Sequence, residues 1–128
     1  MLGLTLQCSA APSEKLLNAI RHVESSDGRD KQAHNTKRLC WGDYQIMQGV
    51  ISDVNRVYHS KYTHIDAMDK NIARRICYLY LDYYGDVFRA ETGIEPTSRT
   101  YARIWNQGYT GRNRSAAKRY WEKIRTHL

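Results

Sequence analysis

The chain has 128 residues, 41% of them hydrophobic, and a formal net charge of +7. This length fits one domain with one core, and we do not expect it to hold a separate binding module as well. No stretch approaches the roughly 20 apolar residues of a membrane span, and the positive charge favours anionic partners such as nucleic acid, anionic lipid or bacterial cell wall.

The N-terminal residues 1–12 are expected to form a tail, and residues 13–128 the folded domain. Met1 to Ala11 is mildly apolar and carries no basic residue, so it does not make a convincing signal peptide. After Pro12, Ser13 can cap a helix. The apolar face of this helix consists of Leu16, Leu17, Ile20 and Val23.

The middle of the chain predicts a loop followed by two helices. Residues 25–39 are polar and contain glycine, which is typical of a loop along the rim of a cleft. Residues 44–57 have apolar side chains at helical spacing, and 58–65 form a polar connection. Asp69 can cap the next helix, which has the broadest apolar face and is expected to be central, with Gly85 at its end or shortly before it.

Two shorter helices complete the expected fold. One begins at Thr97 or Ser98, runs through Trp105 and is closed by Gly108, and the last covers residues 115–125. Alternation with a period of two is scarce. The sequence therefore predicts an all-α fold, or nearly so, with at most one short β-hairpin.

The three cysteines leave the redox compartment open. Cys8, Cys40 and Cys77 are an odd number, so a Cys40–Cys77 disulfide with one free thiol and three reduced thiols are both possible. None of the spacings is that of a metal knuckle.

Glu24 has the position that a general acid requires. It ends the apolar run 16–24 and is followed at once by the polar Ser25-Ser26-Asp27-Gly28. Packed apolar groups on one side of a carboxyl group disfavour its charged form and raise its pKa, while the other side can face substrate. A solvated residue at the end of a helix is the alternative interpretation.

Three segments resemble signature blocks of the lytic transglycosylase and goose-type lysozyme group. They are Val23-Glu24-Ser25-Ser26, Gly42-Asp43-Tyr44-Gln45-Ile46-Met47 and Tyr101-Ala102-Arg103-Ile104-Trp105-Asn106-Gln107-Gly108. In the family the blocks read Glu-Ser, Gly-Leu-Met-Gln-Ile and Ala-Tyr-Asn-Ala-Gly, in the same order and at similar separations. The resemblance spans residues 13–124 and implies a lysozyme-like single domain with a substrate cleft.

The resemblance also implies the reaction, cleavage of the β-1,4 bond between muramyl and glucosaminyl residues of peptidoglycan. Glu24 would protonate the leaving oxygen and then accept a proton from the C6 hydroxyl of the muramyl residue, which gives a 1,6-anhydro sugar. No cofactor or metal is expected. The protein is expected to be a monomer that acts outside the cytoplasm, or as a secreted protein, where this substrate lies.

Further site residues follow from the matched blocks. Ser25 would bind the substrate or cap the loop, and Gln45 and Asn106 would line the cleft or brace their loops. Tyr44 and Trp105 would be stacking platforms. Tyr101, also in the third block, is expected in the cleft, because tyrosine and tryptophan combine an apolar face with a hydrogen-bonding tip.

A second carboxylate would turn the enzyme into a hydrolysing muramidase. Asp27, Asp30, Asp43 and Asp53 are the candidates, and Asp43 is the first choice because the family has an apolar residue there. We therefore take Asp43, with Glu24, as a catalytic candidate.

Two other functions compete. The same fold could cleave another N-acetylglucosamine polymer such as chitin. The basic segments 71–75 and 112–125 could instead serve a non-enzymatic domain that binds wall polymers or nucleic acid. The chain has neither helix-turn-helix spacing nor a zinc knuckle, which disfavours nucleic acid, and its five histidines lack metal-ligand spacing.

Overall fold

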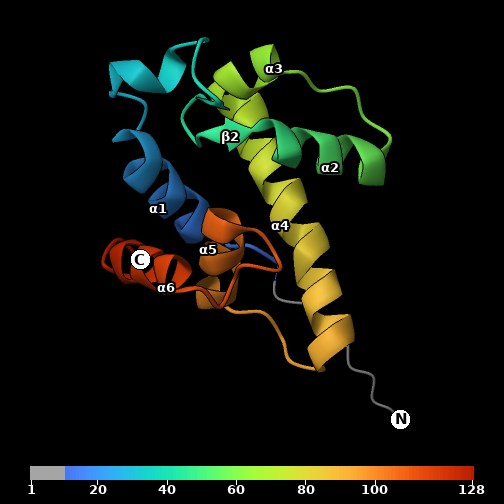
Figure 1. The fold of residues 1–128 in the computed structure, drawn as a ribbon. Coiled ribbons are helices and arrows are strands. Elements are labelled where there is room, and N and C mark those ends of the chain that lie inside the picture. The colour runs from blue at the N-terminus through green and yellow to red at the C-terminus, as the bar shows by residue number, and fades with distance from the viewer. Residues whose placement is uncertain (1–10) are drawn as a thin grey trace.

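A long central helix, α4 (Lys70–Thr92), organises the molecule (Figure 1). The computed structural model describes residues 11–128, and within them six α-helices and one two-stranded antiparallel sheet are present. The expectation of a nearly all-α fold with at most one short hairpin is confirmed.

Helix α1 (Glu14–Ser25) begins as the sequence predicts. The Ser13 side chain accepts a hydrogen bond from the Leu16 backbone N–H at 3.1 Å, which satisfies one of the free donors of the first turn. Leu16, Leu17 and Ile20 are buried, so this helix presents its apolar face to the core and carries Glu24 in its last turn.

The predicted loop after α1 contains one 3₁₀ turn, η1 (Lys31–His34), and leads into the hairpin. Strands β1 (Cys40–Trp41) and β2 (Ile46–Met47) pair Cys40 with Met47 and Trp41 with Ile46. Gly42 has a φ of 78°, and a Cβ there would collide with the Ala67 carbonyl, so the turn requires glycine.

Helix α2 (Gln48–Tyr58) therefore starts four residues later than predicted, because residues 44–47 belong to the hairpin. A short helix, α3 (His64–Met68), was not predicted, since residues 58–65 read as a polar connection. Its first turn is a capping box between Thr63 and Asp66.

Helix α4 is capped by Asp69, whose side chain accepts hydrogen bonds from the backbone N–H groups of Asn71 and Ile72. It continues seven residues past Gly85 to Thr92, with Gly93 as its C-cap, so the prediction that Gly85 lies at or near its end is wrong. Gly85 instead marks close packing: a Cβ there would lie 2.7 Å from the Tyr101 hydroxyl.

The last two helices have nearly the predicted bounds, α5 at Ser98–Gln107 and α6 at Ser115–Arg125. Helix α6 packs against α1 and α5, whereas α2 and α3 pack against the other part of α4 (Figure 1). Helix α4 thus joins two groups of elements, α1, α5 and α6 on one side and the hairpin, α2 and α3 on the other.

The two described cysteines are free thiols, so a Cys40–Cys77 disulfide is wrong. Cys77 is fully buried in the core on α4, and the Cys40 thiol donates to the Gln45 Oε1 atom at 3.1 Å. Cys8 lies outside the described residues.

Candidate active site

A cleft of about 850 Å³ opens between the two groups of elements. Glu24 enters it from the end of α1, Tyr80 from the middle of α4, and the segment 105–108 from the end of α5. The hairpin and α2 supply the opposite wall, whose lining residues include Cys40, Gln45, Met47, Val50 and Asp53.

Glu24 is half-buried at this cleft. Burial raises its pKa above the ordinary value, and the effect is opposed by a hydrogen bond from Tyr120 and by the positive charge of Lys123. The Tyr120 hydroxyl donates to the Oε2 atom of Glu24 at 2.7 Å. Within residues 11–128 the Oε1 atom has no hydrogen-bond partner, which leaves it available to a substrate.

Tyr120 is a site residue that the sequence did not reveal. It lies on the buried face of α6, 96 positions from Glu24 in the chain, and is 7% exposed. Burial and the adjacent Glu24 carboxylate raise the pKa of Tyr120 well above its ordinary value, so its hydroxyl remains a donor. The only sequence signal was its place in the apolar stripe of the last helix, which predicts packing and no more.

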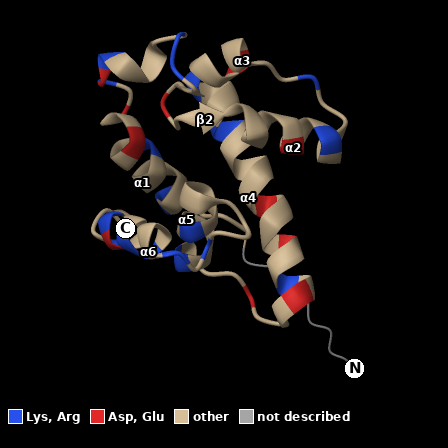
Figure 2. Ribbon diagram, viewed as in Figure 1, with Lys and Arg blue, Asp and Glu red and all other residues tan. Residues whose placement is uncertain are grey.

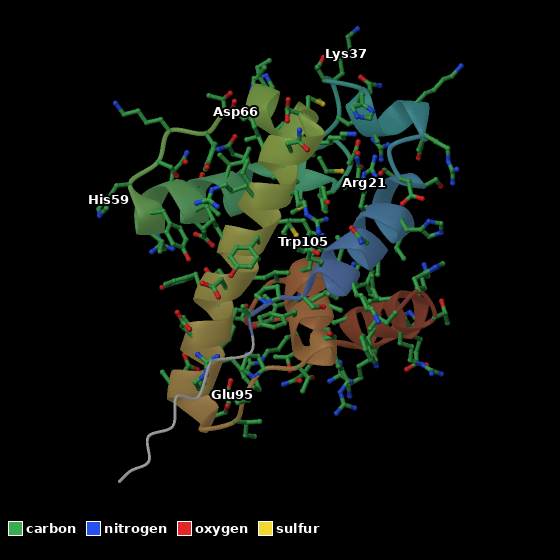
Figure 3. The ribbon with its side chains drawn as sticks, turned by 180° about the vertical axis from the view of Figure 1, so that it is seen from behind. Arg21, Lys37, His59, Asp66, Glu95 and Trp105 are labelled. Carbon is green, nitrogen blue, oxygen red and sulfur yellow. The ribbon has the colours of Figure 1, made fainter. Side chains whose placement is uncertain are left out.

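Trp105 and Asn106 line the cleft. Trp105 lies near the middle of the molecule, where α5 approaches α4, and meets the Tyr80 ring edge-on at 5.7 Å (Figure 3). The Asn106 Oδ1 atom accepts a hydrogen bond from Gln107 at 3.0 Å. A half-buried indole on the wall of the cleft can stack on a sugar ring.

Gln45 also lines the cleft, but its side chain braces the hairpin. Its Nε2 atom donates to the Gly42 carbonyl at 2.9 Å and to the Ala33 carbonyl at 3.3 Å. Its Oε1 atom accepts from the Cys40 thiol. These bonds hold β1, the turn and the end of η1 together.

The structure places the Ser25 hydroxyl inside the loop, not in the cleft. Ser25 is 1% exposed, its hydroxyl lies 2.7 Å from the Asp43 carbonyl, and it accepts a hydrogen bond from the Gly28 N–H at 2.9 Å. Of the two predicted roles, capping the loop is the one that this geometry supports.

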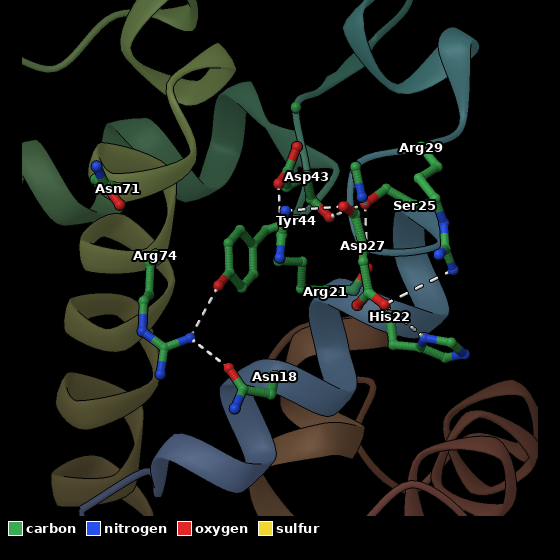
Figure 4. Close-up of polar contacts among 12 residues, drawn as sticks. Asn18, Arg21, His22, Ser25, Asp27, Arg29, Asp43, Tyr44, Asn71 and Arg74 are labelled. Carbon is green, nitrogen blue, oxygen red and sulfur yellow. Dashed lines mark hydrogen bonds and ion pairs between the residues drawn. The ribbon is translucent and has the colours of Figure 1, made fainter.

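The predicted positions of Tyr44 and Tyr101 in the cleft are wrong, since the two side chains are 1% and 3% exposed. The Tyr44 hydroxyl accepts a hydrogen bond from Arg74 at 3.1 Å, and Arg74 also donates to Asn18 (Figure 4). Tyr101 packs beneath Gly85. Both rings fill the core, so neither can be a stacking platform.

Asp43, the predicted second carboxylate, is likewise not in the cleft. Asp43 is 3% exposed, and one of its carboxylate oxygens accepts a hydrogen bond from the Arg21 Nε atom (Figure 4). Its other carboxylate oxygen lies 3.1 Å from the His34 Nε2 atom. This ion pair links the hairpin turn, which carries the buried Asp43, to α1, the helix that carries Glu24. Asp43 therefore helps to hold the hairpin turn against α1 and has no access to a substrate in the cleft.

The carboxylates that share the cleft with Glu24 are Asp30 and Asp53. Asp53 accepts hydrogen bonds from the Tyr84 hydroxyl at 2.6 Å and from Arg56 at 3.0 Å. Asp30 caps η1 through one oxygen, which accepts from the Gln32 N–H at 3.0 Å.

Residues 11–128 contain neither a candidate metal site nor a candidate membrane-spanning helix. No group of three or more His, Cys, Asp or Glu side chains is arranged to hold a metal ion. No helix in this part of the chain combines the length and the apolar character needed to cross a membrane.

Comparisons with known proteins give no relative: no family model, no curated protein and no solved structure matches the chain.

Proposed function

We propose that this protein cleaves glycan strands of peptidoglycan at the bond between muramyl and glucosaminyl residues, with Glu24 as general acid and base. The observation that carries the proposal is the environment of Glu24. Its pKa is raised by burial, one carboxyl oxygen accepts a hydrogen bond from Tyr120, and the residue lines a cleft of about 850 Å³ that Trp105 also borders.

The reaction we favour is a lytic transglycosylation. Protonated Glu24 gives its proton to the glycosidic oxygen, so that the bond to C1 of the muramyl residue breaks while positive charge develops on the ring. The Glu24 carboxylate then accepts the proton of the C6 hydroxyl group while the C6 oxygen forms a bond to C1. The products are a free 4-hydroxyl group and a 1,6-anhydro sugar, and no water is consumed.

The surroundings of Glu24 support both steps. Burial favours the protonated acid before the first step. The hydrogen bond from Tyr120 stabilises the carboxylate that exists between the steps. Neither step requires Asp43, which is bound to Arg21.

Hydrolysis is the second candidate, because Asp30 and Asp53 also line the cleft. Both carboxylate oxygens of Asp53 accept hydrogen bonds, one from Tyr84 and the other from Arg56. In Asp30 only one carboxylate oxygen accepts a hydrogen bond from the described part of the chain, from the Gln32 N–H, and the other is available. If water is the nucleophile, Asp30 is the carboxylate that we expect to activate it.

The distribution of charge gives nucleic-acid binding no such support. Lys and Arg residues lie on the loop after α1, at the end of α2 and on α4, α5 and α6, and are not gathered on one element (Figure 2). A positively charged protein of this kind is attracted to any polyanion, including anionic wall polymers.

The test is mass spectrometry of the products released from purified peptidoglycan. Anhydro-muropeptides would establish transglycosylation, and products heavier by one water would establish hydrolysis. The Glu24→Gln variant should lose at least about 100-fold in rate, because general acid catalysis contributes about 10²–10⁴, while circular dichroism shows an unchanged fold. A folded Glu24→Gln protein that cleaves at the parent rate would sink the proposal.

A further inference from the structure

A second pocket, of about 380 Å³, lies where the end of α4 leads into α5. Glu95 marks this end of the molecule in Figure 3, and Trp105 marks the cleft. Three arginines line it, Arg99 and Arg103 from α5 and Arg112 from the loop before α6, and we call it the arginine pocket.

Arg103 leaves a buried donor unsatisfied. Its Nε atom is inaccessible to solvent and has no hydrogen-bond partner within the described residues 11–128. A buried donor without an acceptor costs free energy, and native proteins rarely keep one without a reason. Because the Nε atom itself is closed off, a ligand in the pocket would meet the terminal amino groups of Arg103, which likewise have no hydrogen-bond partner within residues 11–128.

Arg112 is held in place before any ligand arrives. Its guanidinium lies 4.1 Å from the centre of the Tyr109 ring and 5.7 Å from that of Phe88, and one amino group donates to the Tyr109 carbonyl at 2.7 Å. A guanidinium fixed in this way loses little conformational freedom when it binds an anion, and its other N–H groups are available.

The positive charge of the pocket is not balanced from within. Glu95 also lines the pocket, but its carboxylate is paired with Arg89 at 2.8 Å. The ion pairs found among residues 11–128 include neither Arg99 nor Arg103 nor Arg112. At the start of α5 the Thr97–Thr100 capping box engages the backbone N–H groups of Thr97 and Thr100.

We propose that the arginine pocket binds a phosphate or diphosphate group. Guanidinium groups bind phosphate through paired N–H donors, and a phosphate carries more charge and more acceptor oxygens than a carboxylate, which suits three unbalanced cations. The group could belong to a small phosphorylated compound or to a phosphate-containing polymer, since both present the same chemistry. This site is separate from the cleft and does not depend on the function proposed for Glu24.

The test is isothermal titration calorimetry of the full chain with sodium pyrophosphate and with inorganic phosphate, at fixed ionic strength. Poly(glycerol phosphate) is the polymeric probe and sodium succinate the carboxylate probe. We expect saturable binding of a phosphate probe, much weaker binding of succinate, and a loss of about tenfold in affinity in Arg99→Gln. Binding of the small probes would indicate a small phosphate ligand, and binding of poly(glycerol phosphate) alone would indicate a polymer.

The matched control is Arg119→Gln, which removes the same charge from an exposed position on α6 that does not line the pocket. It should change the affinity less than about twofold. Because Arg99 is exposed, its replacement should not impair folding, which thermal unfolding would verify. The proposal is overturned by the absence of saturable phosphate binding, by equal losses in the two variants, or by succinate binding as tightly as pyrophosphate.

Discussion

The Glu24 carboxyl group experiences two opposing influences from its neighbours. Removal from water favours the protonated form, and the hydrogen bond from Tyr120 favours the charged form, with burial the larger effect. In the reaction that we propose, Glu24 first donates a proton and then accepts one, so neither its protonated nor its charged form can be strongly disfavoured. Tyr120 therefore belongs to the machinery around Glu24 although it lies on a different helix.

Replacing Tyr120 by phenylalanine should shift the pH dependence of the proposed activity. The lost hydrogen bond stabilised the carboxylate, so the pKa of Glu24 should rise further, and the limb on which activity falls with increasing pH should move to higher pH. The measurement is the pH profile of kcat/KM for the parent and Tyr120→Phe. An unmoved limb would mean that Tyr120 only packs, and a limb moved to lower pH would contradict the assignment.

Glu24 should also cost the protein stability at neutral pH. Its pKa is raised in the folded state, so its contribution is most favourable below the pKa of an unfolded glutamate and is lost as pH rises through the folded value. Glu24→Gln, which cannot ionise, should be more stable than the parent at pH 7 and equal to it near pH 3. Urea unfolding at the two pH values measures this, and Glu122→Gln on the exposed face of α6 is the control.

The residues named from the three segments lie partly in the cleft and partly in the core. Glu24, Gln45, Trp105 and Asn106 line the cleft. Tyr44 follows the buried Asp43 in the turn and points into the core, so adjacency in a motif did not imply access to the cleft. Tyr120 comes from a remote helix, and no local pattern identifies such a partner.

At the scale of elements, capping residues and apolar periodicity predicted α1, α4, α5 and α6. They misplaced the start of α2, because the buried Ile46 fits the apolar face of a helix as well as it fits the strand that it forms. Gly85 was misinterpreted for a related reason. Local propensity marks glycine as a helix end, whereas here the absence of a side chain lets Tyr101 approach α4.

The packing of α4 on α5 predicts an unusual effect of Gly85→Ala. Alanine normally stabilises a helix interior by about 0.5–1 kcal/mol relative to glycine. At Gly85 the new Cβ would lie 2.7 Å from the Tyr101 hydroxyl and 2.9 Å from its ring, so the variant should be destabilised by about 1–3 kcal/mol. Chemical denaturation with urea measures the change.

Gly49→Ala is the control for this variant. Gly49 lies in α2, and a Cβ there would meet no atom within 4 Å. This variant should be as stable as the parent or slightly more stable. Equal effects at the two glycines would show that the close contact between α4 and Tyr101 does not determine the cost.

For the molecule as a whole, the cleft is a product of tertiary structure. Glu24 comes from the group of α1, α5 and α6, whereas Gln45 and Asp53 come from the group of the hairpin, α2 and α3. Helix α4 packs against α5 in the first group and against α2 and α3 in the second. Asp43 and Arg21 connect the two groups across the loop that follows Glu24. The side chains of the site therefore come together only when the whole domain has folded.

The net charge of +7 should strengthen binding to peptidoglycan, the substrate that we propose, at low salt. The Debye length shortens from about 30 Å at 0.01 M ionic strength to about 8 Å at 0.15 M, so long-range attraction weakens over this range. Sedimentation with purified peptidoglycan can measure binding of Glu24→Gln, which should leave the wall intact, and we expect binding to fall several-fold. Adding Lys118→Gln and Arg119→Gln lowers the charge by two and should reduce the salt dependence. Binding that is indifferent to salt in both proteins would show that contacts in the cleft, and not the overall charge, hold the protein on the wall.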